Sequence, residues 1–384
     1  MSPLYFDAHA TTPCDPRVVT AMLPYFTETF GNAASRQHVF GWAAREAVDT
    51  ARGEIASLIG ARPKDIVFTS GATESNNLAL KGGAEALAAR GRHLVTVRTE
   101  HSSVLDVCSW LQEQGCDVTF LDVDRDGLVD PDRLRAALRD ETTIVSVMAA
   151  NNEIGVLQPL EAIGRITRER GILFHVDAVQ AAGKVPFDVE RVGADLVSLS
   201  AHKMYGPKGV GALYVRRRGP AADLRPLLHG GGHERGLRSG TLNVPAIVGF
   251  GVAARLCRLE MTQEAETLRA LRDRLLARLE SHPGGVRVNG STTARLPHNL
   301  NVTFQGIDGS RLLLGLTDVA VSSGAACSSA SAAPSHVLMA LGLSEAEAKA
   351  SLRFGLIRGT TAEQVDQAAA RVAEVVTGLR AAKV

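Results

Sequence analysis

A lysine that follows a short apolar run is the first candidate for chemistry in this sequence. The run Leu196–Leu199 is typical of a buried strand. Ser-Ala-His-Lys follows it, and glycine and proline then separate it from a second run, Val210–Val215. A lysine held in a cleft at a strand end is partly desolvated, which lowers its pKa and allows its neutral amine to form an imine with an aldehyde. Considered alone, Lys203 is more often a solvated lysine before a turn, and the other motifs reverse that interpretation.

Two further motifs also follow strand-like runs. Residues 69–77, Thr-Ser-Gly-Ala-Thr-Glu-Ser-Asn-Asn, join a turn of small residues to a helix start. The free N–H groups and the Thr73 hydroxyl could cradle a phosphate there, or the segment is an ordinary helix cap. Residues 174–180, Phe-His-Val-Asp-Ala-Val-Gln, place Asp177 at a strand end, where open α/β sheets bind ligands, and Gln180 three residues later. The carboxylate could hold a protonated pyridine nitrogen, as pyridoxal phosphate requires, or cap the next helix.

Three other polar residues stand where a ligand could meet them. His101, in Thr-Glu-His-Ser-Ser-Val, could stack on a ring and move protons, and Asn152, in Asn-Asn-Glu-Ile-Gly, could donate a hydrogen bond. Each could equally shape a turn. Arg353 lies in an apolar run, where an unpaired charge is costly, so it should meet an anion. That anion is either a structural carboxylate or the carboxylate of a substrate.

One cysteine differs from the others in its surroundings. Cys327 lies among Ser, Ala and Gly in residues 321–331, whereas Cys108 and Cys257 lie in apolar helical patterns and should be packed thiols. A cysteine in such a polar loop is accessible and could act as a nucleophile. The glycine-dense residues 229–241 could close on a phosphate, reach a neighbouring subunit or form a solvated loop. No histidine or cysteine spacing predicts a metal site.

Composition limits the classes of protein that this chain can be. It has 384 residues, of which 45% are hydrophobic, which is enough for a large core and suggests two lobes. A net charge of +1 favours neither nucleic acid nor a membrane surface as a partner. No stretch is apolar enough to span a bilayer, and the first residues do not resemble a signal peptide. Five cysteines, an odd number, favour a reducing compartment, so we expect a cytoplasmic protein.

The elements that must position these residues alternate along the chain. Short β-rich runs are separated by segments with helical spacing, which predicts an α/β fold with a mostly parallel sheet covered by helices. The predicted strands are Ile66–Thr69, His93–Val97, Val118–Leu121, Thr143–Met148, Ile172–Val176 and Leu196–Leu199.

The pattern changes after a long helical stretch that begins near Pro245 and runs toward Glu280. Strands at Asn299–Phe304 and Ser351–Gly355 alternate with further helices, the last of which has one apolar face. We therefore expect a large domain over 15–258 and a smaller α+β domain formed by 1–14 and 259–384.

Taken together, these motifs resemble the cysteine desulfurases, in the class V branch of the aminotransferase-like pyridoxal-phosphate enzymes. The matching strings occur in family order over nearly the whole length: DAHATTP, TSGATESNN, TEHSSV, NNEIGV, FHVDAVQ, SAHKMYGPKGVG, GGGHERGLRSGT and SSGAACSS. The last string is similar to the group that includes the housekeeping and nitrogen-fixation enzymes. The best-known members carry Ser where Ala325 stands and Thr where Ser328 stands, and both changes keep the residue small.

The resemblance implies an aspartate aminotransferase-like fold, pyridoxal 5'-phosphate as cofactor and a role for each matching residue. Lys203 would hold the cofactor covalently, His101 would stack on its ring, Asp177 would pair with the pyridine nitrogen and Gln180 would bond the ring oxygen. The resemblance places the phosphate on Thr73, Ser200, His202 and the backbone of Ala72, with Thr241 reaching the phosphate of the partner subunit. It places the substrate carboxylate on Asn152 and Arg353, and it makes Cys327 the nucleophile.

The implied reaction converts L-cysteine to L-alanine. Lys203 would remove the α-proton, and Cys327 would take the substrate sulfur as a persulfide and deliver it to an acceptor, either an iron–sulfur scaffold or another sulfur carrier. The enzyme would be a homodimer. A selenocysteine lyase or a class V aminotransferase would keep Lys203 and Asp177, and the aminotransferase would not need Cys327. A purely structural role in iron–sulfur assembly would need none of these three residues.

Overall fold

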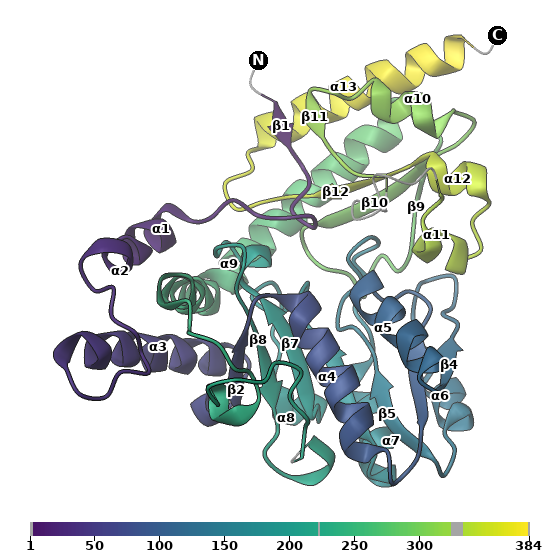
Figure 1. Cartoon of the computed structure of the whole chain (residues 1–384). Coiled ribbons are helices and arrows are strands. Elements are labelled where there is room, and N and C mark those ends of the chain that lie inside the picture. The colour runs from purple at the N-terminus through teal and green to yellow at the C-terminus, as the bar shows by residue number, and fades with distance from the viewer. Residues whose placement is uncertain (1–2, 222, 324–332, 383–384) are drawn as a thin grey trace.

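A seven-stranded sheet forms the centre of the larger lobe (Figure 1). The structure, a computed structural model, describes residues 3–221, 223–323 and 333–382. The four strand pairs from β7 to β4 are parallel, and β8 runs antiparallel to both of its neighbours, so the sheet is mostly parallel, as the alternating pattern predicts. In spatial order the strands are β2 (Ile66–Thr69), β8 (Gly211–Val215), β7 (Leu196–Ser200), β6 (Leu173–Asp177), β5 (Thr142–Ser146), β3 (His93–Val97) and β4 (Asp117–Leu121).

Helices cover both faces of this sheet, and for that reason the strands are apolar throughout. Within β7, Val197 and Leu199 face a core that includes residues of α3, α7 and the first half of α9, whereas Leu196 faces a core built with α4 and α5. The helices of this lobe are α1 (Pro16–Met22), α2 (Pro24–Thr27), α3 (Val39–Leu58), α4 (Ala72–Leu87), α5 (Ser102–Glu113), α6 (Pro131–Ala137), α7 (Leu160–Arg170) and α8 (Val189–Val192).

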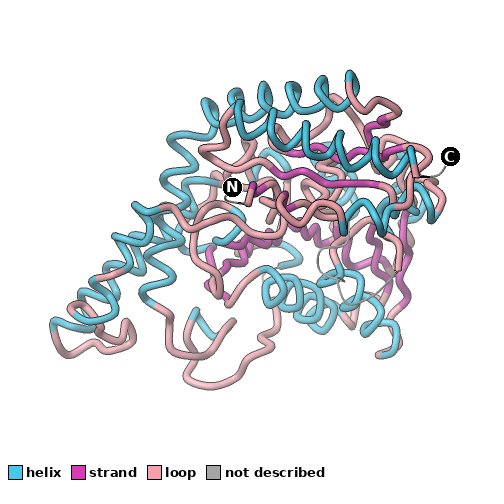
Figure 2. The backbone as a smooth tube through the Cα atoms, turned by 90° about the horizontal axis from the view of Figure 1, so that it is seen from above, coloured by secondary structure: helices cyan, strands magenta, loops and turns pink. Residues whose placement is uncertain are grey.

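The smaller lobe has its own core around an antiparallel sheet of three strands. It lies above the larger lobe in Figure 1 and faces the viewer in Figure 2, which looks down on the chain from above. β1 (Leu4–Tyr5), near the start of the chain, pairs with β11 (Val319–Ala320), so the N-terminal segment joins this lobe before it crosses to the other. The remaining elements are β9 (Val286–Val288), β10 (Asn299–Phe304), β12 (Ser351–Gly355), α10 (Gly309–Leu314), α11 (His336–Ala340), α12 (Glu345–Lys349) and α13 (Ala362–Ala381).

One helix of 38 residues, α9 (Val244–Ser281), connects the two cores. Its buried residues up to Cys257 belong to the core of the large sheet, and those from Leu268 onward belong to the core of the smaller lobe. The helix passes without a break through position 258, where the sequence pattern places a domain boundary. None of the described helices combines the length and the apolar character needed to cross a membrane.

Candidate active site

A cavity of about 780 Å³ lies where strands of the large sheet end and the smaller lobe meets them. Most of the residues singled out in the sequence line it: Ala72, Thr73, His101, Asn152, Asp177, Gln180, Ser200, His202, Lys203 and Arg353. Thr241 is solvent-exposed and is not among the lining residues, and Cys327 lies outside the described residues. The parallel strands explain this convergence, because their carboxyl ends meet at one edge of the sheet.

Lys203 reaches the cavity from a single turn of 3₁₀ helix, Ala201–Lys203, that directly follows β7. Its Nζ donates to the carbonyl oxygens of Ala10, at 2.8 Å, and His9. The N-terminal segment therefore holds the amine at the cavity wall through two neutral acceptors. Both of these acceptors are backbone carbonyls of the N-terminal segment, so the segment and the strand end position the amine together.

Asp177 is the last residue of β6 and is buried. Its Oδ2 accepts from Asn76 Nδ2 at 2.8 Å and its Oδ1 from the Val179 N–H at 3.0 Å. A turn follows it rather than a helix, so the interpretation of Asp177 as a helix cap is wrong. Neutral donors thus orient a buried carboxylate at the cavity, where it would stabilise a positively charged ring nitrogen.

The N-terminus of α4 opens on the same cavity. Its N-cap is Gly71, which has no side chain to cap the first turn, so the amides of Ala72 and Thr73 stand at an uncapped helix end. The backbone of Gly211 in β8 passes close by, and a Cβ on it would lie 2.7 Å from Gly71 Cα. A helix N-terminus in this state favours an anion, and phosphate is the usual one.

His202 and Ser200 flank this helix end. His202 Nδ1 lies 3.1 Å from Thr11 Oγ1. Burial, and then the positive charges of Lys203 and Lys208, lower the pKa of His202 to about 4. The ring is therefore neutral at physiological pH and offers a phosphate a neutral hydrogen bond rather than a charge.

His101 is the N-cap of α5 and lines the cavity. Its Nδ1 accepts the N–H of Ser103 at 3.1 Å, which fixes the plane of the ring. The neighbouring Glu100 is fully buried, and burial together with Asp177 raises its carboxyl pKa well above the usual value. Glu100 Oε1 accepts the backbone N–H of Met148, so this side chain supports the cavity wall.

Arg353 is buried in β12 and meets an anion, as its apolar surroundings predict. Its Nη2 donates to Asp7 Oδ1 at 2.7 Å, and its Nη1 donates to the carbonyl of Asn152 at 2.9 Å. The third donor, Nε, is buried and has no partner among the described residues. The structure therefore shows a structural ion pair and one donor still unsatisfied beside the cavity.

Sequence reasoning gave no role to several residues that line this cavity. They include His9, Thr11, Glu153, Lys208 and His336. His9 and Glu153 lie inside two of the strings on which the resemblance rests. Their place in those strings is the signal that could have marked them as residues of the site. Burial raises the pKa of the Glu153 carboxyl, which accepts a hydrogen bond from Ser335 Oγ. Among the described residues, no group of His, Cys, Asp and Glu gathers as a metal site would require.

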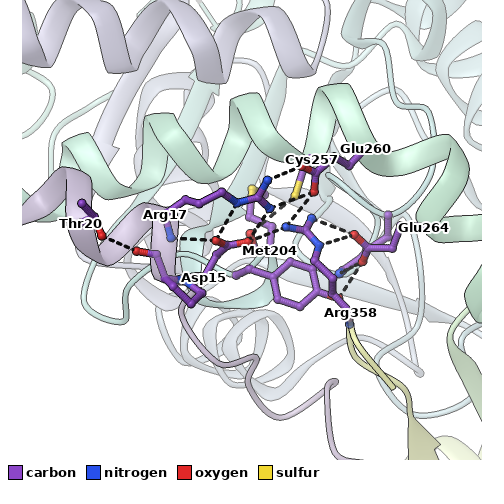
Figure 3. Close-up of polar contacts among 11 residues, drawn as sticks. Asp15, Arg17, Thr20, Met204, Cys257, Glu260, Glu264 and Arg358 are labelled. Atoms are coloured by element: carbon purple, nitrogen blue, oxygen red, sulfur yellow. Dashed lines mark hydrogen bonds and ion pairs between the residues drawn. The ribbon is translucent and has the colours of Figure 1, made fainter. Parts of the chain in front are cut away.

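A second polar region, here called the ionic cluster, lies outside the residues that line the cavity: Asp15, Arg17, Glu260, Glu264 and Arg358 (Figure 3). Asp15 Oδ2 accepts from both Arg17 and Arg358 at 2.8 Å, and Arg358 also pairs with Glu264 at 2.8 Å. Tyr205, two residues after Lys203, donates its hydroxyl to Glu264 at 2.7 Å. The cluster thus ties the N-terminal segment, α9 and the chain after β12 together.

The comparisons with known proteins agree with this geometry. The family model described as "Aminotransferase class-V" matches residues 4–368. The protein named "Cysteine desulfurase IscS" from Anaeromyxobacter sp. (strain Fw109-5) is 61% identical over 98% of this chain and 93% of its own length. This chain is a cysteine desulfurase of the class V aminotransferase family. A second relative of that desulfurase name, from Methylococcus capsulatus, is 55% identical over 98% of the chain and 93% of its own length.

Solved structures of similar proteins share the fold of this desulfurase. A "NIFS-LIKE PROTEIN" superposes with a TM-score of 0.91 at 38% identity and covers 98% of this chain and 100% of its own. The structure entitled "SspA in complex with cysteine" has a TM-score of 0.81 at 39% identity, covering 92% of this chain and 98% of its own. The fold predicted from the sequence, a pyridoxal-phosphate transferase with a mostly parallel sheet, is confirmed.

The cofactor of this desulfurase is pyridoxal 5'-phosphate, and the cavity fits it. The uncapped end of α4, with Ser200 and His202, suits the phosphate. The buried carboxylate of Asp177 suits a pyridinium nitrogen, and the amine of Lys203 lies at the same cavity for the aldehyde.

Proposed function

We propose that this enzyme converts L-cysteine to L-alanine and takes the sulfur onto Cys327 for delivery to an acceptor protein. The observation that carries the proposal is that Lys203 and Asp177 line one cavity, and that other residues of its wall contact the described residues on either side of Cys327. Ser322 pairs through its backbone with Arg353, and Ser335 donates its hydroxyl to Glu153, so both described flanks contact residues of the cavity wall.

In this proposal each cavity residue has a defined task. When bound, pyridoxal phosphate supplies the electron sink that allows an amino acid to lose its α-proton. Asp177 keeps the ring nitrogen protonated, and Lys203 Nζ accepts and later returns the proton at the α-carbon. His101 stacks on the ring, Gln180 donates to the ring oxygen, and the carboxylate of the substrate is held by Asn152 and the unsatisfied Nε of Arg353.

The sulfur step belongs to Cys327. Its thiolate attacks the sulfur of the substrate, so an S–S bond forms as the bond between that sulfur and the β-carbon breaks. The electron pair of the broken bond stays with the carbon fragment, which takes up protons and leaves as alanine. The bound sulfur then passes from the Cys327 persulfide to an iron–sulfur scaffold or another sulfur carrier.

We propose that the enzyme is a homodimer, and an exposed apolar surface supports this. Large apolar side chains on α1 to α3, the arm that projects from the larger lobe in Figure 1, are about half or more exposed. They are Leu23, Phe26, Phe30, Val39, Phe40 and Trp42. A second copy would cover them and bring the exposed Thr241 to the phosphate of the partner's cavity. Free cysteines support our placing the protein in the cytoplasm.

Quantifying alanine and sulfide from L-cysteine, with and without a thiol reductant, tests the proposal. Cys327→Ser should bind cofactor and L-cysteine with the wild-type spectral response and release almost no sulfide. Mass spectrometry of the wild type should find the added sulfur on the Cys327 peptide. Turnover of selenocysteine alone would favour a lyase, and Cys327→Ser that transfers amino groups at the wild-type rate would favour an aminotransferase. Sulfur found on Cys14, Cys108, Cys116 or Cys257 would contradict the mechanism.

A further inference from the structure

Four buried side chains form a hydrogen-bonded row, here called the relay, that ends at the cavity: Arg295, Asn299, His9 and Gln180. Arg295 Nη1 lies 2.8 Å from Asn299 Oδ1, and Asn299 Nδ2 lies 3.0 Å from His9 Nε2. His9 Nδ1 lies 3.0 Å from Gln180 Oε1, and Gln180 Nε2 lies 3.1 Å from the carbonyl oxygen of His9. Only His9 and Gln180 line the cavity.

The donor at one end of the relay determines the direction of every bond in it. A guanidinium can only donate, so the atom of Asn299 that faces Arg295 must be its oxygen. Asn299 then presents its nitrogen to His9 Nε2, which must accept. The proton of the neutral ring therefore lies on Nδ1, which donates to Gln180 Oε1.

The orientation of Gln180 follows from these bonds. Its oxygen is engaged by His9 Nδ1, and one hydrogen of its amide nitrogen is engaged by the backbone carbonyl of His9. The second hydrogen of that nitrogen remains for an acceptor in the cavity. A flipped amide would set its oxygen against the carbonyl oxygen of His9, so Gln180 is a donor toward the cavity.

Close packing fixes the relay in place. The His9 ring stacks on His298, with 4.6 Å between centroids and 26° between planes. Gly155 has φ +71°, and a Cβ there would lie 2.4 Å from Asn299 Cγ. A Cβ on Gly355 would lie 2.7 Å from His9 Cδ2. A side chain at either position would displace Asn299 or His9, so the relay needs both glycines.

Burial, helped by nearby positive groups, keeps the ring of His9 neutral. Burial lowers the pKa of His9 well below the usual value, and His298, Arg353 and Lys203 lower it further, whereas the hydrogen bond to Gln180 acts in the opposite direction. A second proton on the ring would point at the amide hydrogens of Asn299. The relay thus keeps one direction over the physiological pH range.

We propose that His9 is a positioning residue that holds the Gln180 amide as a hydrogen-bond donor to the ring oxygen of the cofactor, an inference that rests on the proposed function. A donor at that oxygen stabilises its anion. The strength of the hydrogen bond from Gln180 to the ring oxygen then depends on His9. It also depends on Asn299, although Asn299 does not line the cavity.

The test measures the visible absorbance of the holoenzyme across pH, because the protonation of the bound cofactor is read from it. His9→Phe keeps a ring and removes both relay bonds, so the spectral midpoint should rise by about one pH unit, as expected when a hydrogen bond to a charged oxygen is lost. His9→Asn, whose amide can donate near the former Nδ1, should restore at least about half of that shift. His298→Phe, which alters the stacked neighbour and no relay bond, should leave the midpoint unchanged.

Nitrogen-15 NMR of the histidine-labelled wild-type holoenzyme tests the relay without any variant, and one variant then checks the direction of the bonds. The wild type should show His9 protonated at Nδ1 between pH 6 and 8, and Asn299→Asp should move that proton to Nε2, because a carboxylate can only accept. Protonation at Nε2 in the wild type, or a His9→Phe midpoint equal to the wild-type one, would overturn the relay. A wild-type protein that binds no chromophore would instead overturn the proposed function.

Discussion

The cavity and the ionic cluster are built from opposite chemistry. Toward the cavity, Lys203 and Asp177 are oriented mainly by neutral groups, which are backbone carbonyls for the amine and N–H groups for the carboxylate. By contrast, the ionic cluster pairs each carboxylate with an arginine or lysine, for example Glu264 with both Arg358 and Lys184. The hydrogen bonds that orient Asp177 thus come from neutral groups, whereas the carboxylates of the ionic cluster are neutralised by arginine and lysine.

This difference separates the tasks of ligand binding and of holding the chain together. A charge oriented by neutral groups can interact strongly with a ligand, because no opposite charge competes with it in the buried site. A charge already paired contributes to rigidity and has little left for a ligand. Activity should therefore depend on the cavity, and the ionic cluster should act on stability.

The largest effect should come from Lys203→Ala. Loss of the covalent link and of the proton acceptor should lower kcat by at least about 10³-fold. Borohydride reduction followed by peptide mapping should label Lys203 in the wild type and no lysine in the variant. Lys208→Ala, which removes another lysine of the cavity wall, should keep the label. Labelling of a different lysine in the wild type would contradict the assignment.

Asp177→Asn should have the second-largest effect on activity, a fall in kcat of roughly 10²–10³-fold, because an amide cannot keep the ring nitrogen protonated. The amide can still bond Val179 N–H, so the fold and the bound cofactor should be retained. Absorbance and circular dichroism would check both, beside steady-state kinetics. Unchanged turnover with cofactor bound would reduce Asp177 to a structural acceptor.

Acid should affect the cavity and the ionic cluster at different pH. Burial lowers the pKa of His175, two residues before Asp177, to about 4. The unfolded chain takes up that proton from about pH 6.5 downward, so stability falls with pH by up to about 3 kcal/mol through this residue. Glu264 has a lowered pKa, with Lys184 and Arg358 opposing the effect of burial, so its contribution is lost only as pH falls below about 4.5.

Subtracting the stability of each variant from that of the wild type isolates the contribution of His175 or of Glu264. The contributions of buried carboxyls such as Glu100 cancel in this difference, although the raised pKa of Glu100 makes stability rise as pH falls. Urea unfolding of the wild type and of His175→Gln should give a stability difference that changes between pH 7 and pH 4. The difference between the wild type and Glu264→Gln should stay constant over most of that range. Equal pH profiles for the two differences would remove the distinction between the cavity and the ionic cluster.

Arg353 should show the smallest effect on activity, because it forms a structural ion pair and also has a donor left for the substrate. Arg353→Ala should raise the KM for L-cysteine by about tenfold, the cost of one hydrogen bond to a charged group, and should also lower stability. Asp7→Asn removes the ion pair and keeps the guanidinium, so it should lower stability with little change in KM. If both variants raise KM equally, Arg353 acts on the substrate only through the fold.

Local pattern predicted the strands of the large sheet and two strands of the smaller lobe, but not β1, β9 or β11. The strands Ile66–Thr69, His93–Val97, Asn299–Phe304 and Ser351–Gly355 have the predicted bounds. The predicted strand Thr143–Met148 is wrong at its end, since β5 ends at Ser146 and the following residues stay buried without continuing the strand. An apolar run indicates that its residues are buried, but buried residues need not belong to a strand.

The sequence by itself also determined which residue types end the strands, and parallel topology alone brings such ends to one edge. Only the tertiary structure decided the contacts that cross the chain: Asp7 with Arg353, 346 positions apart, and His9 with Gln180, 171 positions apart. Side-chain periodicity carries information over a few residues in a strand or a helix. The partner of a buried charge or imidazole depends instead on how the N-terminal segment closes over both lobes, and no local spacing encodes that closure.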